Sequence, residues 1–418
     1  MGKVSRQTTN SKNFTTIAKN TIPIGVNYPW GEYGWDFGLH TWGRRPWTKT
    51  IASALNEFKD LKIRVVRWFI LADGMCYGTG AQAPKWNKQK KYWECTPPGK
   101  ISIKPIVEDF KLLLEEFQKV APIQLLPSLI DFHWLFPGKP AIDSANNPVS
   151  GFIKGGRYDV LLNSDKRKKF LDTVLDELLE CSVKYKDSIF AWEIINEPEW
   201  MMQGHQNPNH WTLYQWPFDN KPKDDADRKK TEKIIAAFQH PQLGIDYDPA
   251  SKQWPEKIPA WQIPDKVMEE FVKDASQRIK GKGFMATVGS KTGSDLRWLK
   301  FWKKCGVDLF QFHDYQDKKG KATVALAKGN LDKNGLSPCI IGEFPTRWGK
   351  RCTWYGASLS DEKVTESFIR DAKTNKWPLI LPWGRFSKDP ETNWDSTKKA
   401  IQKLLKEGII YKGQKWPL

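Results

Sequence analysis

Short apolar runs alternate along the chain with stretches in which apolar residues recur at helical spacing. Eight runs have the length and apolar character of buried strands: residues 24–28, 63–70, 123–130, 189–196, 283–289, 308–315, 339–344 and 379–384. One helical stretch follows each run: residues 48–61, 104–120, 165–185, 264–280, 296–304, 323–328, 361–375 and 393–407. Eight strand–helix repeats predict an α/β fold, a single (β/α)8 TIM barrel. A doubly wound open sheet is the alternative, but no glycine-rich phosphate-binding turn follows the first run.

Two segments fall outside this repeat. Residues 1–20 are polar and predict a flexible N-terminal arm, followed by one barrel domain over residues 21–418. Residues 199–261 form a loop insertion of unusual length, in which 228–240 has helical spacing, and residues 71–103 form a second long loop. Loops of this length are typical of lids or binding walls, so we expect long loops after the strands.

Two of the predicted strands end in a glutamate. The strand 189–196 is followed by Glu197 and Pro198, and the strand 339–344 carries Glu343. The carboxyl ends of barrel strands meet at one mouth, where this fold places its chemistry. Two such carboxyl groups are the minimum equipment for glycoside hydrolysis. Either glutamate alone is explained equally well as the partner of an arginine, but the pair favours chemistry.

Other strand ends carry further polar and aromatic residues: Arg67, His133, Asn196, His313, Tyr315 and Trp383. Each has a structural interpretation by itself. A strand-end arginine often pairs with an acid, a histidine is more often structural than catalytic, and a tryptophan more often packs in the core. Their convergence on one mouth with the two glutamates predicts a single active site.

The ordered set of motifs resembles the retaining glycoside hydrolases of clan A, most closely glycoside hydrolase family 5, the cellulase and mannanase family. The resemblance covers roughly residues 22–410. Its motifs are Asp131-Phe132-His133, Asn196-Glu197-Pro198, His313-Asp314-Tyr315, Gly342-Glu343-Phe344 and Pro382-Trp383. The Asn-Glu-Pro motif occurs in several families of the clan, whereas the ordered set is much more specific.

The resemblance implies a role for each residue at the mouth. Glu197 is expected to be the general acid/base and Glu343 the nucleophile, with Arg67 and Tyr315 holding Glu343 ionised and aimed. This chemistry requires no metal and no cofactor.

The remaining four residues are expected to act on the substrate. Asn196 would bind the sugar 2-hydroxyl, an interaction that strengthens in the transition state. His133 and His313 would orient the acid/base and the sugar hydroxyls, and Trp383 would stack beneath the sugar at the cleaved bond.

The function implied by the resemblance is retaining β-glycoside hydrolysis. The expected substrate is a β-linked glucan or mannan, cleaved as by an endo-β-1,4-glycanase through double displacement with two glutamates. The alternatives are an exo-acting β-glycosidase, a transglycosylase on the same barrel, and a non-catalytic carbohydrate- or polyanion-binding protein. The intact Glu197 and Glu343 argue against the last of these.

The chain contains 22 tryptophans, more than core packing needs. Seven fall on predicted loops: Trp30, Trp86, Trp93, Trp200, Trp211, Trp216 and Trp254. Flat aromatic rings stack on the apolar faces of sugars, so these positions predict an open cleft that binds a poly- or oligosaccharide. Rings that pin the loops to the barrel would account for about half of them.

The formal net charge is +18, but the lysines are scattered over the predicted surface helices and no nucleic-acid-binding motif is present. We therefore expect a solvated basic surface, no nucleic-acid partner and a monomer. No apolar run is long enough to span a membrane. The first 20 residues lack the apolar segment of a signal peptide, which predicts a cytoplasmic protein, or a secreted one if a signal has been removed. Cys76 and Cys95 share one loop, and their pairing is left open.

Overall fold

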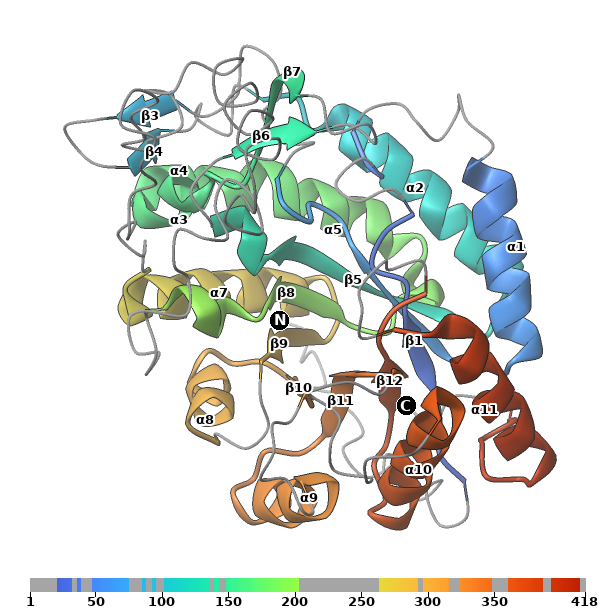
Figure 1. Cartoon of the computed structure of the whole chain (residues 1–418). Helices are drawn as coiled ribbons and strands as arrows, with labels where there is room; N and C mark the ends of the chain where they lie inside the picture. The colour runs from blue at the N-terminus through green and yellow to red at the C-terminus, as the bar shows by residue number, and fades with distance from the viewer. Residues whose placement is uncertain are drawn as a thin grey trace, which may run out of the picture.

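The structure, a computed structural model of the chain, describes residues 21–31, 36–38, 47–74, 85–87, 92–94, 101–135, 139–142, 148–202, 263–291, 296–315, 323–347, 360–385 and 392–413. Its centre is a parallel sheet in the order β1-β2-β5-β8-β9-β10-β11-β12 (Figure 1). The strands are Gly25–Asn27 (β1), Val65–Phe69 (β2), Gln124–Asp131 (β5), Trp192–Asn196 (β8), Ala286–Ser290 (β9), Leu309–His313 (β10), Cys339–Phe344 (β11) and Ile380–Pro382 (β12). A bridge between Ile24 and Ile380 joins the first strand to the last. The sheet is thus a nearly closed barrel, and the predicted (β/α)8 fold is confirmed.

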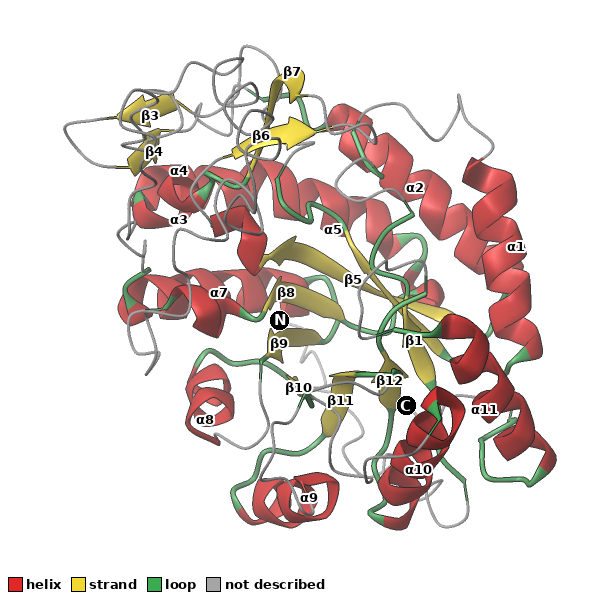
Figure 2. Ribbon diagram, in the orientation of Figure 1, coloured by secondary structure: helices red, strands yellow, loops and turns green. Residues whose placement is uncertain are grey.

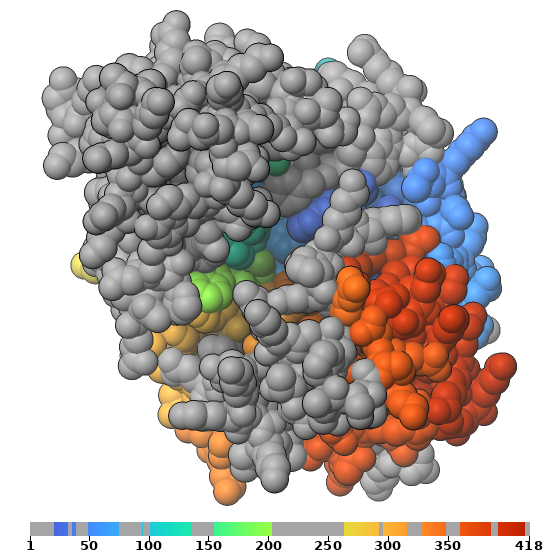
Figure 3. All heavy atoms as spheres, viewed as in Figure 1, coloured from blue at the N-terminus to red at the C-terminus, as the bar shows by residue number. Residues whose placement is uncertain are grey.

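Helices cover the outside of this barrel (Figures 1 and 2). They are Trp47–Asp60 (α1), Lys104–Lys119 (α2), Asp176–Val183 (α5), Asp265–Gly281 (α7), Leu296–Lys304 (α8), Thr323–Lys333 (α9), Asp361–Thr374 (α10) and Trp394–Lys406 (α11). Their apolar faces pack on the outward side chains of the strands and form the main core, in which Trp68, Trp192 and Phe110 are fully buried. Burying one such large side chain contributes about 1.5–3 kcal/mol. In the space-filling view, blue to green segments of the barrel lie at the bottom of a recess (Figure 3).

The interior of the barrel is apolar where the strands begin. A separate buried cluster fills it there: Val65, Leu126, Phe190, Ala191, Leu309, Ile340, Leu379 and Leu381. Side chains alternate along a strand, so the residue two positions further on faces the same interior. At those positions the chain has polar residues that are also fully buried: Arg67, Ser128, Glu193 and Gln311. A polar layer therefore lies directly above the apolar one, on the side of the strands' carboxyl ends.

Two irregularities in strand pairing turn the strand-end residues toward this interior. The pairing of β8 with β9 shifts between Glu193 and Asn196, and the pairing of β10 with β11 shifts so that His313 lies opposite Glu343. An extra residue in a strand reverses which side chains face inward beyond it. Without this shift Glu193 and Asn196, three residues apart, would point to opposite faces of the sheet.

The structure also contains elements that the sequence pattern did not predict. The hairpins Lys85–Asn87 (β3)/Tyr92–Glu94 (β4) and Lys139–Ile142 (β6)/Pro148–Lys154 (β7) lie in stretches expected to be loops. Their strands are too short to show alternation of apolar and polar residues. Both hairpins lie on one side of the barrel (Figure 1). Trp86 and Trp93, expected on a loop, are backbone pairing partners in the first hairpin.

The helix predicted over 165–185 is interrupted. It begins as Ser164–Phe170 (α4), takes π-helical hydrogen bonding over Leu171–Leu175 and continues as α5. A further short helix, Tyr158–Leu162 (α3), precedes it. Three 3-10 turns lie at Phe132–Leu135 (η4), Lys186–Ser188 (η6) and Pro198–Met201 (η7). The first and third follow β5 and β8 and begin the loops at the mouth.

Several sequence predictions concern residues outside the described ranges. These are the arm at 1–20, the helix at 228–240, most of the insertion 199–261, and the pair Cys76 and Cys95. The division into arm and barrel domain stays a prediction. Within the described ranges Cys181, Cys305 and Cys339 are free thiols.

Residues 166–169 of α4 form a cationic run, three of whose members pair with neighbouring acids. Lys166 is paired with Asp159, and Lys168 lies 2.7 Å from Asp172. A third member of the run, Arg167, lies 2.6 Å from Glu270. These pairs reduce the positive charge of a surface that the sequence predicted to be basic and solvated. Among the described helices, none is long and apolar enough to cross a membrane.

Candidate active site

Arg67 on β2 is the centre of the polar layer. Its guanidinium has five N–H groups, and each has an acceptor. Nε and Nη2 donate to the two oxygens of Glu193, both at 2.6 Å. Nη2 also donates to Asn196 Oδ1 at 2.7 Å. Nη1 donates to Glu343 Oε1 at 2.5 Å and to Asn27 Oδ1 at 3.0 Å. The guanidinium is therefore fixed in one orientation, with Nη1 directed at Glu343.

Glu193 on β8 is a residue of this site that sequence reasoning missed. Its carboxylate accepts four hydrogen bonds, two from Arg67, one from Ser128 Oγ at 2.9 Å and one from Gln311 Nε2 at 2.6 Å. A Cβ on Gly289 would lie 2.9 Å from Glu193 Oε1, so glycine is needed beside it. The available sequence signal was an acidic residue inside an otherwise apolar strand. Such a residue requires a buried cation, and Arg67 in β2 supplies one.

Glu193→Ala is expected to destabilise the protein by about 3–5 kcal/mol, because it leaves the buried Arg67 with a single carboxylate partner. Chemical denaturation of the variant measures this change in the free energy of unfolding. Glu108→Ala is the control, since Glu108 lies 3.8 Å from Lys104 in a pair whose side chains are both exposed, on the outer helix α2. A surface pair of that kind contributes about 1 kcal/mol or less. Equal losses in the two variants would contradict the buried-pair interpretation.

Glu343 lies at the end of β11 and is held by two donors. Arg67 Nη1 bonds to its Oε1, and the Tyr315 hydroxyl donates to its Oε2 at 3.0 Å. Burial raises the pKa of Glu343 to about 7, against the opposing effects of His313 and Arg67. Arg67 is permanently charged and bonded to Glu343. We therefore expect Glu343 to lose its proton before Glu197 does.

Glu197 follows β8 in a left-handed backbone conformation, with φ of +43°. This conformation costs a non-glycine residue roughly 1–2 kcal/mol. The Glu197 N–H donates to Gly289 O at 2.6 Å, which helps to hold it. Its side chain is 13% exposed and points into the mouth. Burial raises the pKa of Glu197 to about 7, and a hydrogen bond from Trp200 opposes the rise.

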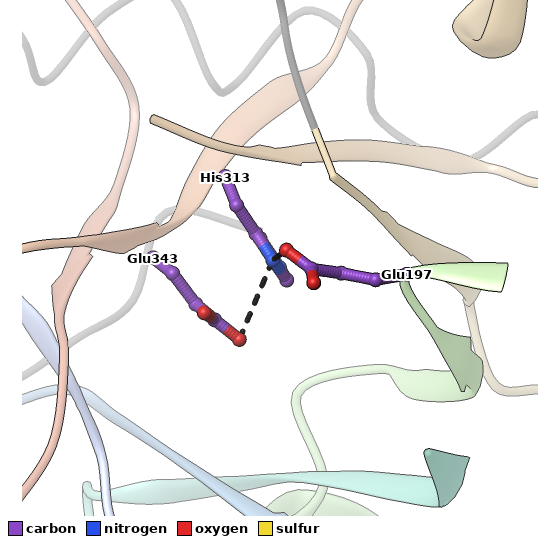
Figure 4. A group of neighbouring side chains, drawn as sticks. All are labelled: Glu197, His313 and Glu343. Atoms are coloured by element: carbon purple, nitrogen blue, oxygen red, sulfur yellow. Dashed lines mark hydrogen bonds and ion pairs between the residues drawn. The ribbon is translucent and has the colours of Figure 1, made fainter. Parts of the chain in front are cut away.

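His313 on β10 lies between the two glutamates (Figure 4). Its Nδ1 is 2.6 Å from Glu197 Oε1 and 3.4 Å from Glu343 Oε1. Burial lowers the pKa of His313 to about 4, so the ring is neutral at neutral pH. One oxygen of each glutamate and one nitrogen of the ring lie within 4.8 Å of one another. This spacing could hold a metal ion, but Arg67, bonded to the same Glu343 oxygen, opposes a second cation there.

A second chain of hydrogen bonds leads from Arg67 to the rim. Asn196 Nδ2 donates to Asp131 Oδ1 at 2.7 Å, and the other oxygen of Asp131 is bonded to His133 Nδ1. The His133 side chain is 39% exposed, so it lies at the edge of the site. Asp131, which lies in one of the sequence motifs, was not among the predicted site residues, although it links Asn196 to His133.

An aromatic cluster forms one wall of the mouth. Trp383, one residue after β12, is buried with Phe69 and Ala72, and the partly buried Trp30 and Tyr315 pack against them. Trp30 meets Trp383 edge-on, with ring centroids 6.1 Å apart. Phe69 also lies under Arg67, whose guanidinium carbon is 4.8 Å from its ring centroid. The structure therefore brings together the predicted Trp383 and Trp30, and adds Phe69.

Two further buried carboxyl groups lie near the site. Glu199 is completely buried, and burial raises its pKa to about 7. Asp314 is 2% exposed and burial raises its pKa to about 7 as well. Its Oδ2 has no hydrogen-bond partner in the described part of the chain. Burial thus favours the protonated form of the Asp314 carboxyl group. Its backbone N–H donates to Glu343 O at 2.9 Å, and among the described residues its side chain is not bonded to the carboxyl group of Glu197 or Glu343.

The fold is similar to that of several solved β-mannanases. The enzyme of the blue mussel Mytilus edulis aligns with a TM-score of 0.57 and 17% identity over 95% of each chain. The β-1,4-D-mannanase of Cryptopygus antarcticus aligns with a TM-score of 0.55 and 17% identity, over 95% of this chain and 92% of its own. The β-1,4-mannanase of the sea hare Aplysia kurodai gives 0.54 and 18%, over 92% of each chain.

No protein-family model and no curated protein sequence matches the chain. Identities below 20% show a shared fold rather than a shared activity. The roles of the individual site residues stay predictions. At the level of fold the resemblance predicted from the motifs is confirmed: over most of its length the chain has the (β/α)8 architecture of the β-mannanases.

Proposed function

We propose that the protein is a retaining β-glycoside hydrolase that cleaves a β-linked mannan or glucan internally, by double displacement. The observation that carries the proposal is the spacing of Glu197 and Glu343, one oxygen of each lying within 4.8 Å of the other. Retaining enzymes hold their two carboxyl groups about 5–5.5 Å apart, whereas inverting enzymes need about 6.5–9.5 Å to admit a water molecule.

In the first step Glu343 is the nucleophile. One of its oxygens attacks the anomeric carbon while the glycosidic carbon–oxygen bond breaks, and the leaving oxygen takes the proton of Glu197. The products are a glycosyl ester of Glu343 and an ionised Glu197. Arg67 and the Tyr315 hydroxyl keep Glu343 ionised and aimed before the attack.

In the second step Glu197 is the general base. It takes a proton from a water molecule whose oxygen attacks the anomeric carbon, and the ester bond to Glu343 breaks. Each step inverts the anomeric centre, so the two together retain its configuration. A pKa near 7 suits Glu197 for this exchange, because it can then hold the proton and release it near neutral pH.

The substrate is proposed from the aromatic wall and from the structural relatives. The aromatic wall contains Trp383 and Trp30 and reaches Tyr315, which bonds to Glu343, and stacking on a sugar contributes roughly 1 kcal/mol per ring, judged by aromatic contacts generally. The structurally similar enzymes are named as β-mannanases, which makes β-1,4-mannan the first substrate to test.

A screen of glycans tests the proposal. The full chain is incubated with β-1,4-mannan, mixed-linkage β-glucan, cellulose and xylan, and the early products are resolved by chromatography. We expect a ladder of oligosaccharides from mannan or glucan, and none with Glu343→Gln. If the only early product is a monosaccharide, the enzyme cleaves from the chain end rather than internally. Products longer than the substrate would indicate transglycosylation. The absence of new reducing ends from every glycan would contradict hydrolysis.

A further inference from the structure

Trp200 lies three residues after Glu197 and contacts its carboxyl group. The Trp200 indole N–H donates to Glu197 Oε2 at 2.8 Å, while Glu197 Oε1 lies 2.6 Å from His313 Nδ1. Each oxygen of the carboxyl group therefore has its own nitrogen partner. An indole N–H can only donate, so its bond is stronger to an ionised carboxylate than to a carboxylic acid.

Lys291 lies against the face of the same indole. Its Nζ is 3.2 Å from the centroid of the Trp200 ring, close enough for a strong cation–π contact. A cation on the ring face withdraws electron density from the indole and makes its N–H a better donor. The positive charge of Lys291 also acts directly on Glu197, whose pKa it lowers.

Glu199 fixes Trp200 and Lys291 relative to each other. It lies in the same 3-10 turn as Trp200, and its buried carboxylate accepts hydrogen bonds from the Ser290 hydroxyl, from Trp302 Nε1 at 3.1 Å and from the Lys291 backbone N–H at 3.3 Å. These bonds attach the turn after β8 to the end of β9. The indole and the lysine that covers it are thus held by one anchor.

We propose that Trp200, covered by Lys291 and anchored through Glu199, is a positioning residue that fixes the carboxyl group of Glu197 and favours its ionised form. The inference rests on the proposed function, in which Glu197 gives up a proton in the first step and takes one in the second. A bond that favours the ionised form helps the first step and opposes the second. Trp200 therefore sets the balance between the two steps through its bond to Glu197.

Other charged and titratable groups near Glu197 also influence its ionisation. They are Arg67 on β2, Asp131 on β5, Glu199 on η7, Lys291 after β9, His313 on β10 and Glu343 on β11. Replacing Trp200 by phenylalanine keeps an aromatic ring under Lys291 and leaves all of these groups in place. The change thus isolates the indole N–H. Trp394→Phe is the matched control, because its indole donates to Glu57 at the same distance of 2.8 Å on the outside of the barrel.

Indole nitrogen NMR tests the bond without requiring turnover. The indole peak that disappears in Trp200→Phe identifies Trp200 in the spectrum of the full chain. We expect this peak to move with pH around a midpoint near 7, and to stop moving in Glu197→Gln. A Trp200 peak that stays still between pH 5 and 9, or that titrates equally in Glu197→Gln, overturns the inference.

The pH profile of kcat/KM tests its consequence. Activity falls on the alkaline side as Glu197 loses the proton it must donate, and Trp200 lowers the pKa of that group, so Trp200→Phe should move the alkaline limb upward. The expected shift is about one pH unit, which corresponds to one hydrogen bond to a charged acceptor. Trp394→Phe should leave the limb unchanged. No shift in Trp200→Phe, or an equal shift in the control, overturns the inference.

The two measurements separate this inference from the proposed function. A Trp200 peak that titrates with Glu197 supports the hydrogen bond even if no glycan is cleaved. The absence of cleavage would then contradict only the hydrolase proposal. Glycan cleavage with a Trp200 peak that does not titrate supports the hydrolase and overturns the role of Trp200.

Discussion

Replacing Glu343 by alanine is expected to lower kcat on every glycan substrate by about 10⁴- to 10⁶-fold, the loss that follows removal of a covalent nucleophile in other hydrolases. Glu343 lies beside Glu197 and accepts hydrogen bonds from Arg67 and Tyr315, which in the proposed mechanism favour its ionised form. Without it no glycosyl ester can form, whatever the quality of the leaving group. Initial rates with a polysaccharide and with an activated aryl glycoside measure the loss, and both should fall together.

Asp314→Asn serves as the matched control for this variant. Asp314 is a buried carboxyl group on the same strand end as His313, and burial raises its pKa to about 7, which favours the protonated form that asparagine imitates. Activity should stay within a few-fold of that of the parent. If Glu343→Ala loses no more activity than Asp314→Asn, Glu343 is not the nucleophile.

Glu197→Ala is expected to lower kcat on a polysaccharide by about 10²- to 10⁴-fold, the usual contribution of a general acid. An aryl glycoside whose leaving group needs no proton should keep much of its first step. The glycosyl ester then accumulates, because no base activates water for the second step. Azide, which needs no base, should therefore accelerate turnover of the aryl glycoside by Glu197→Ala and yield a β-glycosyl azide.

The same azide experiment discriminates between the two glutamates. Rescue of Glu343→Ala instead, with a product of inverted configuration, would exchange the roles assigned to Glu197 and Glu343. A measurement of burst kinetics with the aryl glycoside adds a second check, since only the loss of the base should leave the burst intact.

The sequence predicted the barrel and most residues of the mouth because both depend on local pattern. Eight apolar runs separated by helical stretches identify parallel strands, and the position at a strand's end determines which residues meet. Arg67, Glu197, His313 and Glu343 accordingly lie together in the structure. The hairpins β3–β4 and β6–β7 were not predicted, because strands of three to seven residues show too little alternation of apolar and polar positions.

The contacts that orient the site could not be predicted, because they arise between strands. Glu193 and Arg67 come from β8 and β2 and meet only when the barrel forms. The shift in pairing that turns Asn196 inward depends on the register of two strands, which no single strand encodes. The sequence placed Trp200 on a loop but could not predict that it donates to Glu197 and lies against Lys291, because both contacts depend on the 3-10 turn after β8.

The configuration of the first product tests the double displacement most directly. Proton NMR of a β-linked oligosaccharide mixed with the full chain shows which anomer of the new reducing end appears before mutarotation. Two successive inversions at the anomeric carbon, first by Glu343 and then by water, predict that the β-anomer appears first. Initial appearance of the α-anomer would mean a single displacement by water and would contradict a nucleophilic Glu343.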